Sequence, residues 1–122
     1  MNFPHRWLTD QLAIAGQLSP HQLGEIHEAG FKTLICNRPD FEGGPSQPTA
    51  AELQLAAESL GLKFCCLPVS PAGGTPEEAM KMGELMSQMP TPILAYCASG
   101  GRCMGLISLA AQLGQPIPGA DQ

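Results

Sequence analysis

Short apolar segments alternate with helical patterns along this chain. The segments predict β-strands, because each is bounded by polar or turn-forming residues and is too short for a helix. Between and after them, apolar residues recur every three or four positions, as in an amphipathic helix. Strands that alternate with helices form parallel sheets. The pattern predicts one α/β domain with a four-stranded, mostly parallel sheet flanked by helices, its strands at 12–15, 33–37, 63–67 and 92–97.

Polar residues mark the expected helix starts. Ser19, Thr49 and Thr75 each precede a helical pattern and have Gln or Glu three positions later, which is the capping-box arrangement. With 122 residues the chain is one domain, expected over 1–114 and followed by a flexible C-terminal tail at 115–122. The last helix is expected over 103–113, with Leu106, Ile107, Ala110 and Leu113 facing the core.

Charge and cysteine content exclude several classes. Six Lys and Arg against eleven Asp and Glu give a net charge of −5, which argues against nucleic acid and anionic membrane surfaces as partners. No apolar run reaches transmembrane length and the N-terminus lacks a signal-like stretch, so we expect a cytoplasmic protein. Five cysteines, none at CxxC spacing and none close in sequence to a histidine, predict free thiols, no metal site and no cofactor.

The loop at 97–102 carries the residues whose types and spacing indicate a reactive, anion-binding site. Cys97 ends a predicted strand, and Arg102 opens the next helix. A helix N-terminus lowers the pKa of a nearby cysteine, and an arginine offers a planar fork to two anion oxygens. We therefore predict that Cys97 is a nucleophile and Arg102 an anion clamp. Loop N–H groups would complete the anion site, at Ala98, Ser99, Gly100 and Gly101.

A structural alternative fits the same loop. A free cysteine is often a small apolar core residue, and paired glycines can be only a turn. The arginine behind the loop and the helix that follows it favour the anion site.

The spacing Cys-x-x-Gly-x-Arg resembles the anion-cradling loops of cysteine phosphatases and rhodaneses. The wider chain resembles a bacterial family, the phosphatase-like domain of the beta-lactamase hydrolase-like protein, over roughly residues 8–113. The resemblance implies a fold like that of the dual-specificity phosphatases, with Cys97 as nucleophile and Arg102 as clamp. The matching segments are LAIAGQ at 12–17, CNRPD at 36–40, LPVSP at 67–71 and LAYC at 94–97.

This loop also departs from the family pattern. The family usually has Arg, Thr and Ser where Ala98, Gly101 and Cys103 stand. The residue after the arginine matters most, because a hydroxyl there helps the thiolate to leave. A thiol at Cys103 is a poorer donor, which predicts slow turnover.

Two features separate phosphate from sulfur chemistry. Only four residues stand between Cys97 and Arg102, as in many rhodaneses, whereas the usual phosphatase signature has five. Phosphatases also protonate the leaving group with an aspartate, and the loop at 68–75 has no carboxylate. Asp40 is the candidate acid, although a turn role fits it too, and Glu77 and Glu78 lie where helix capping explains them.

The sequence leaves more than one role open for Arg38 and for the remaining cysteines near the expected site. Arg38 could add positive potential to the anion site, or it could pair with Asp40 or Glu42. Cys103 is a candidate redox partner that could trap an oxidised Cys97, as could Cys65 or Cys66 on a neighbouring strand, although all three could be core fillers.

Three functions remain open at this point. The first is a cysteine-dependent phosphatase-like hydrolase that acts on a small phosphate ester. The second is a rhodanese-like sulfurtransferase that carries a persulfide on Cys97. The third is a non-catalytic, anion-binding regulatory module. The partner in each is a small anion, and the sequence gives neither the substrate nor the oligomeric state.

Overall fold

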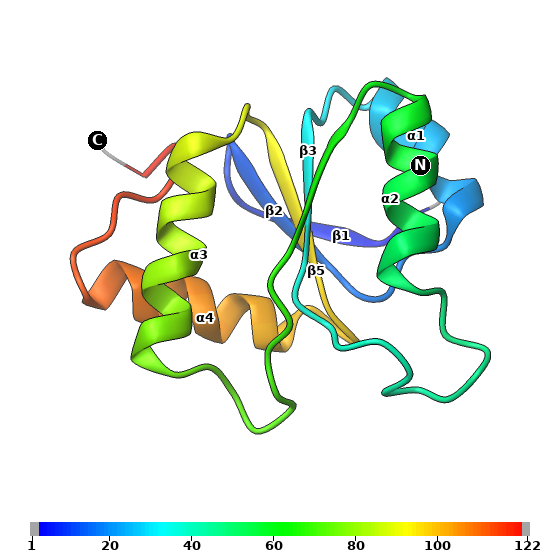
Figure 1. The fold of residues 1–122 in the computed structure, drawn as a ribbon. Helices are drawn as coiled ribbons and strands as arrows, with labels where there is room; N and C mark the ends of the chain where they lie inside the picture. Colours follow the sequence, from blue (N-terminus) through cyan, green and yellow to red (C-terminus); the bar gives the residue numbers. More distant parts are fainter. Residues whose placement is uncertain (1–2, 121–122) are drawn as a thin grey trace.

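The computed structural model describes residues 3–120 and contains a five-stranded sheet in the order β1-β2-β5-β3-β4 (Figure 1). Strand β2 pairs in parallel with β5, β5 with β3, and β3 with β4, whereas β1 runs antiparallel to β2 at one edge. The predicted fold class, a single α/β domain with a mostly parallel sheet, is confirmed. The strands are β1 (His5–Thr9), β2 (Leu12–Ala15), β3 (Thr33–Cys36), β4 (Lys63–Cys66) and β5 (Ile93–Tyr96).

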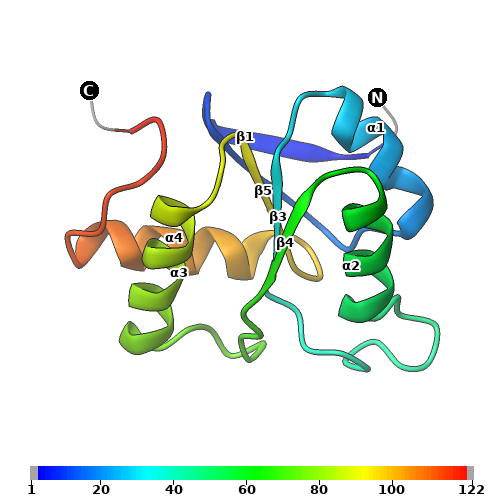
Figure 2. The ribbon, with the colours of Figure 1, turned by 45° about the horizontal axis from the view of Figure 1, so that its top comes forward.

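Helices cover both faces of the sheet (Figures 1 and 2). One face carries α1 and α2, and the other carries α3 and α4. The Thr49 and Thr75 hydroxyls accept the N–H groups of Glu52 and Glu78, so these two predicted capping boxes are present. The helices are η1 (Pro20–Gln22), α1 (Leu23–Glu28), α2 (Ala50–Ser59), α3 (Pro76–Gln88) and α4 (Gly101–Gln112).

The core lies in two layers, one on each side of the sheet. Leu34 and Leu94 pack under α1 and α2, whereas Ile35 and Ile93 pack under α3 and α4. The strands β2, β3 and β5 are buried along their whole length. Burial on both faces explains why they read as continuous apolar segments rather than alternating ones.

Strand β1 is the element that the sequence pattern did not predict. Its five residues, HRWLT, lie at the sheet edge, and none of them is fully buried. An edge strand without a buried face has no alternation of apolar and polar residues to detect. Long-range pairing with β2 therefore creates this strand, and the pairing is irregular between Trp7 and Thr9.

Helix α4 also differs at both ends from its prediction. It begins at Gly101, two residues earlier than expected, so Arg102 lies in its first turn. At the other end the prediction for Leu113 is wrong, because Leu113 is 43% exposed, whereas Leu106, Ile107 and Ala110 are buried as expected. Leu113 is the C-cap residue of α4 with φ −87° and ψ 6°, which is no longer helical, so the helical spacing that predicted its burial does not extend to it.

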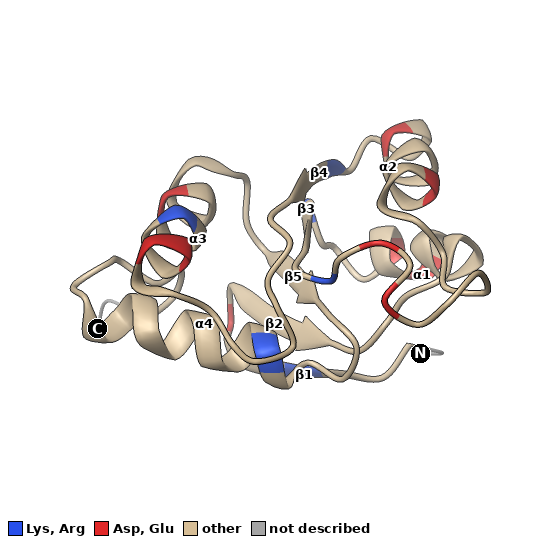
Figure 3. Ribbon diagram, turned by 60° about the horizontal axis from the view of Figure 1, so that its bottom comes forward, with Lys and Arg blue, Asp and Glu red and all other residues tan. Residues whose placement is uncertain are grey.

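The segment after α4 contacts the domain as far as the structure describes it. The Thr9 hydroxyl donates to the Pro118 carbonyl at 2.6 Å, and Ile117 packs against the core beside α3 and α4. Residues 121–122 of the expected flexible tail lie outside the described residues, and the tail's flexibility stays a prediction. Between residues 3 and 120, no helix combines the length and the hydropathy that crossing a membrane requires. Basic residues are spread over separate elements rather than gathered in a stripe (Figure 3).

Candidate active site

The candidate site lies where the parallel strands end. Cys97 directly follows β5, Arg38 follows β3 by two residues, and Val69 follows β4 by three. The loop residue Gln17 follows β2 and is tied to the site loop by a bond from its N–H to the Ala98 carbonyl at 3.3 Å. This is the edge at which open α/β sheets bind ligands.

A tight turn wraps the Cys97 sulfur. The Gly100 N–H donates to Cys97 Sγ at 3.1 Å, and the Gly101 N–H donates to Ser99 Oγ at 3.4 Å. Gly100 has a φ of 92° and stands directly before α4, so a residue free of a Cβ is needed to turn the chain here. The turn thus brings N–H groups and a helix N-terminus against the sulfur, as the sequence predicts.

Hydrogen bonds favour the thiolate form of Cys97. The Cys103 thiol donates to Cys97, and this contact, with N–H groups of Cys103, Ser99 and Gly100, lowers the pKa of Cys97 to about 4 against the opposing effect of burial. The same contact and burial raise the pKa of Cys103, which therefore stays protonated as the donor. Cys103 is the cysteine that contacts Cys97, whereas Cys66 contacts Cys36.

The low pKa of Cys97 predicts a distinctive alkylation profile. A lowered pKa keeps the thiolate present as the pH falls, so the rate with iodoacetamide should be nearly constant from about pH 9 to about pH 6 and decline only near pH 4. Cys103→Ala removes the main donor and should raise the inflection by about one pH unit or more. Cys103→Ser keeps a donor and should leave the inflection low. Ordinary alkaline titration of Cys97 in the wild type would contradict this assignment.

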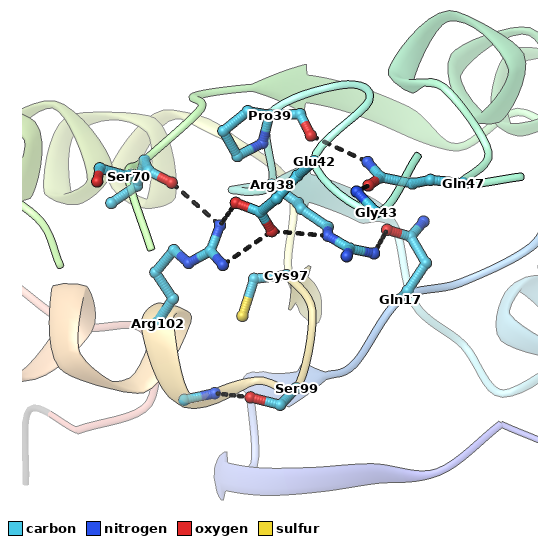
Figure 4. Close-up of polar contacts among 12 residues, drawn as sticks. Gln17, Arg38, Pro39, Glu42, Gly43, Gln47, Ser70, Cys97, Ser99 and Arg102 are labelled. Atoms are coloured by element: carbon cyan, nitrogen blue, oxygen red, sulfur yellow. Dashed lines mark hydrogen bonds and ion pairs between the residues drawn. The ribbon is translucent and has the colours of Figure 1, made fainter. Parts of the chain in front are cut away.

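A carboxylate joins two arginines beside the cysteine (Figure 4). Arg102 donates from its two terminal nitrogens to the two Glu42 oxygens at 3.1 and 3.0 Å, and also to the Val69 carbonyl at 3.1 Å. Arg38 donates from Nε to Glu42 at 2.9 Å and from a terminal nitrogen to the Gln17 side chain at 3.1 Å. Of the two partners expected for Arg38, Glu42 is therefore the one it contacts.

Glu42 holds Arg102 in place, and its carboxylate also competes with any bound anion for the positive charge of Arg102. Hydrogen bonds from Arg102 and then Arg38 lower the pKa of Glu42, so it is ionised at neutral pH. Sequence reasoning named Glu42 only as a pairing option for Arg38. The available signal was its place in a loop after a parallel strand, which does not reveal a contact with a residue 60 positions away.

Neutralising Glu42 is expected to strengthen anion binding. Glu42→Gln keeps an oxygen for the arginines but removes the charge that competes with a bound anion. We expect inorganic phosphate to bind roughly two- to fivefold more tightly, as measured by titration calorimetry. This change in affinity corresponds to the free energy that a partly exposed ion pair contributes. Glu77→Gln, on the exposed start of α3, is the matched control and should change nothing. Weaker phosphate binding in Glu42→Gln would mean that holding Arg102 in place outweighs the charge.

Asp40 does not lie among these groups. Its Oδ1 accepts the N–H of Ala50 at 2.8 Å, at the start of α2. Glu78 likewise accepts the N–H of Thr75 at the start of α3. Both contacts are the helix-capping and turn roles that the sequence offered as alternatives. A catalytic role for Asp40 stays a prediction.

A small cavity opens beside the loop. It has a volume of about 290 Å³, and no carboxylate is among the described residues that line it. Cys97 itself is only 1% exposed, so a reagent reaches its sulfur through this cavity. The lining residues are Pro71, Gly73, Gly74, Cys97, Ser99, Gly101, Arg102, Gly105 and Leu106.

Comparison with known proteins assigns the family. The family model described as "Beta-lactamase hydrolase-like protein, phosphatase-like domain" matches residues 4–114. The chain belongs to this family. A beta-lactamase hydrolase-like protein of Agrobacterium fabrum is 30% identical over 114 residues, which cover 93% of this chain and 26% of that protein. The chain thus spans about a quarter of the length of this curated relative.

Solved structures support the same family and fold. The crystal structure of a putative phosphatase from Neisseria meningitidis shares 35% identity at a TM-score of 0.77, covering 83% of this chain and 71% of that one. A kinase-associated phosphatase with its catalytic-site cysteine replaced by serine has the same fold, with a TM-score of 0.66 at 11% identity, covering 91% and 76% of the two chains. The expected family and its phosphatase-type fold are confirmed, and the domain is phosphatase-like.

Proposed function

We propose that this domain is a cysteine-dependent phosphatase-like hydrolase of small phosphate esters, with Cys97 as nucleophile. The observation that carries the proposal is the Cys97 sulfur held by loop N–H groups and by the Cys103 thiol, directly before α4. Membership in a phosphatase-like family supports the same chemistry. The Neisseria relative is itself described as a putative phosphatase.

The reaction uses two displacements at phosphorus. The Cys97 thiolate attacks phosphorus, the ester oxygen leaves with its electron pair, and a cysteinyl phosphate forms. Arg102 and the N–H groups of Ser99, Gly100 and Gly101 stabilise the charge on the phosphate oxygens. Water then attacks phosphorus and releases inorganic phosphate, which restores the thiolate. The Cys103 thiol, already hydrogen-bonded to the sulfur, stabilises the departing thiolate in this second step.

The lining of the cavity limits the leaving group. A phosphatase protonates the departing oxygen with a carboxylic acid, and no described lining residue offers one. The domain is therefore expected to prefer esters whose leaving group is stable as an anion, such as aryl phosphates.

A second candidate, sulfur transfer, is favoured by the short loop and by the described cavity lining, which contains no carboxylate. Four residues separate Cys97 from Arg102, one fewer than in the usual phosphatase signature. The smaller anion-binding loop that results suits a sulfane sulfur donor better than a phosphate monoester. In this reaction the thiolate attacks the outer sulfur of thiosulfate, sulfite leaves with the bonding electrons, and a Cys97 persulfide remains. A thiolate or cyanide then takes the outer sulfur. The step needs no general acid, which fits a cavity without a carboxylate.

One paired assay separates the candidates. Wild-type protein in reductant is given para-nitrophenyl phosphate, whose leaving group needs no proton, and separately thiosulfate with cyanide. Cys97→Ser serves as the matched background in both. Release of nitrophenolate only by wild type supports the hydrolase. Thiocyanate formation without phosphatase turnover would overturn it in favour of sulfur transfer. Turnover of neither, with Cys97 confirmed as a free thiol, would leave an anion-binding module.

A further inference from the structure

A second cysteine pair lies at the same edge of the sheet, outside the candidate site. Cys36 ends β3 and Cys66 ends β4, and the two residues are direct partners in the parallel register. The Cys66 thiol donates a hydrogen bond to the Cys36 sulfur. Nothing in the proposed chemistry at Cys97 uses either thiol.

The two side chains point to the same face of the sheet. Cys36 belongs to the core layer under α1 and α2, and Phe64 of β4 packs against that layer. Since strand side chains alternate, Cys66 shares the face of Phe64. Cys65 packs against the opposite layer instead. Neighbouring strands lie about 4.8 Å apart, within the roughly 4.4–6.8 Å between Cα atoms that a disulfide spans.

Accessibility and ionisation suit this pair to oxidation. Cys66 is exposed, whereas Cys36 is 2% exposed, so an oxidant reaches the pair from the Cys66 side. The hydrogen bond from Cys66 lowers the pKa of Cys36 to about 7. The same hydrogen bond and burial raise the pKa of Cys66, so Cys36 is the sulfur that carries the negative charge.

We propose that Cys36 and Cys66 form a reversible disulfide in response to peroxide. The Cys36 thiolate attacks a peroxide oxygen, the O–O bond breaks, and hydroxide leaves, which gives a sulfenic acid on Cys36. The Cys66 sulfur then attacks the Cys36 sulfur, and the hydroxyl leaves as water with the Cys66 thiol proton. In total, two thiols and one hydrogen peroxide give one disulfide and two waters.

The pair lies at the base of both loops that hold Arg102. The Cys36 thiol donates to the Arg38 carbonyl at 3.3 Å, and the Cys36 carbonyl accepts the Leu67 N–H at 2.8 Å. Arg38 in turn donates to Glu42, and Val69 stands two residues after Leu67 in the chain. Arg102 donates both to the Glu42 carboxylate and to the Val69 carbonyl. A disulfide removes the S–H donated to the Arg38 carbonyl, so the oxidised pair changes the support of Arg102.

Peptide mapping tests the disulfide independently of any activity. The Cys97→Ser protein is used so that the low-pKa thiolate neither consumes peroxide nor exchanges with the pair. After peroxide treatment and blocking of free thiols, trypsin separates Cys36 in peptide 33–63 from Cys66 in peptide 64–81. We expect the two peptides to be linked, the intact protein to lose two hydrogen atoms, and both changes to be reversed by reductant.

Two variants in this background assign the bond. Peptide 64–81 contains both Cys65 and Cys66, so Cys65→Ser is the matched control and should leave the link intact. Cys66→Ser should abolish it. A link that survives in Cys66→Ser, or Cys36 and Cys66 that both remain alkylatable after the peroxide treatment, would overturn the proposal. Because the readout is a covalent bond, the result does not depend on which reaction Cys97 performs.

Discussion

Replacing Cys97 with serine should lower turnover by about a thousandfold or more, whichever of the two reactions the domain performs. At neutral pH the Cys97 sulfur is a thiolate, since its pKa is about 4, whereas a serine hydroxyl there stays protonated. No described residue lining the cavity is a carboxylate or a histidine that could deprotonate serine. Loss of a nucleophile costs on the order of 10³–10⁶ in rate in enzymes that act through covalent intermediates. The measurement is kcat on the preferred substrate in reductant.

A structural check accompanies this variant. Cys97 is buried, and serine is nearly isosteric, so the melting temperature should stay within a few degrees of the wild type. Cys66→Ser is the matched control, because it makes the same substitution at another strand end and should keep turnover. If Cys97→Ser retains more than about a tenth of wild-type turnover while folded, the nucleophile assignment is wrong.

Replacing Arg102 with lysine should lower kcat/KM by about a hundredfold, the second largest effect. Lysine keeps the charge but loses the planar fork that presents two donors at once. Removal of one donor from a preorganised oxyanion site costs about 10²–10³ in rate. The variant also cannot reproduce the paired contacts to both Glu42 oxygens, so the cation loses its fixed position beside the loop.

Arg38→Lys provides the comparison for Arg102. Arg38 contacts the same carboxylate, but it does not line the cavity. We expect less than about a tenfold loss for this variant, because it acts on Arg102 only through Glu42. Equal losses in the two variants would show that overall positive charge, rather than the fork of Arg102, determines activity.

The sequence by itself determined most features whose signal lies within a few residues, although it misplaced both ends of α4. The capping boxes at Thr49 and Thr75 predict helix starts because their partners lie three residues away. The strands β2, β3 and β5 are predicted because burial on both faces demands continuous apolar segments. Cys97 and Arg102 stand in one short turn before a helix, so their proximity follows from spacing alone. The order of these elements was enough to predict a mostly parallel α/β sheet.

Only the tertiary structure decided which distant residues meet. Glu42 contacts Arg102, which stands 60 positions later in the chain. Parallel pairing of β3 with β4 brings Cys66 beside Cys36, thirty positions earlier. Asp40 lies only two residues before Glu42, yet it contacts the start of α2 rather than Arg102. Strand β1 exists because it pairs with β2, not because of its own pattern. Such contacts depend on strand order and loop paths, and these are set by packing of the whole sheet rather than by the preferences of neighbouring residues.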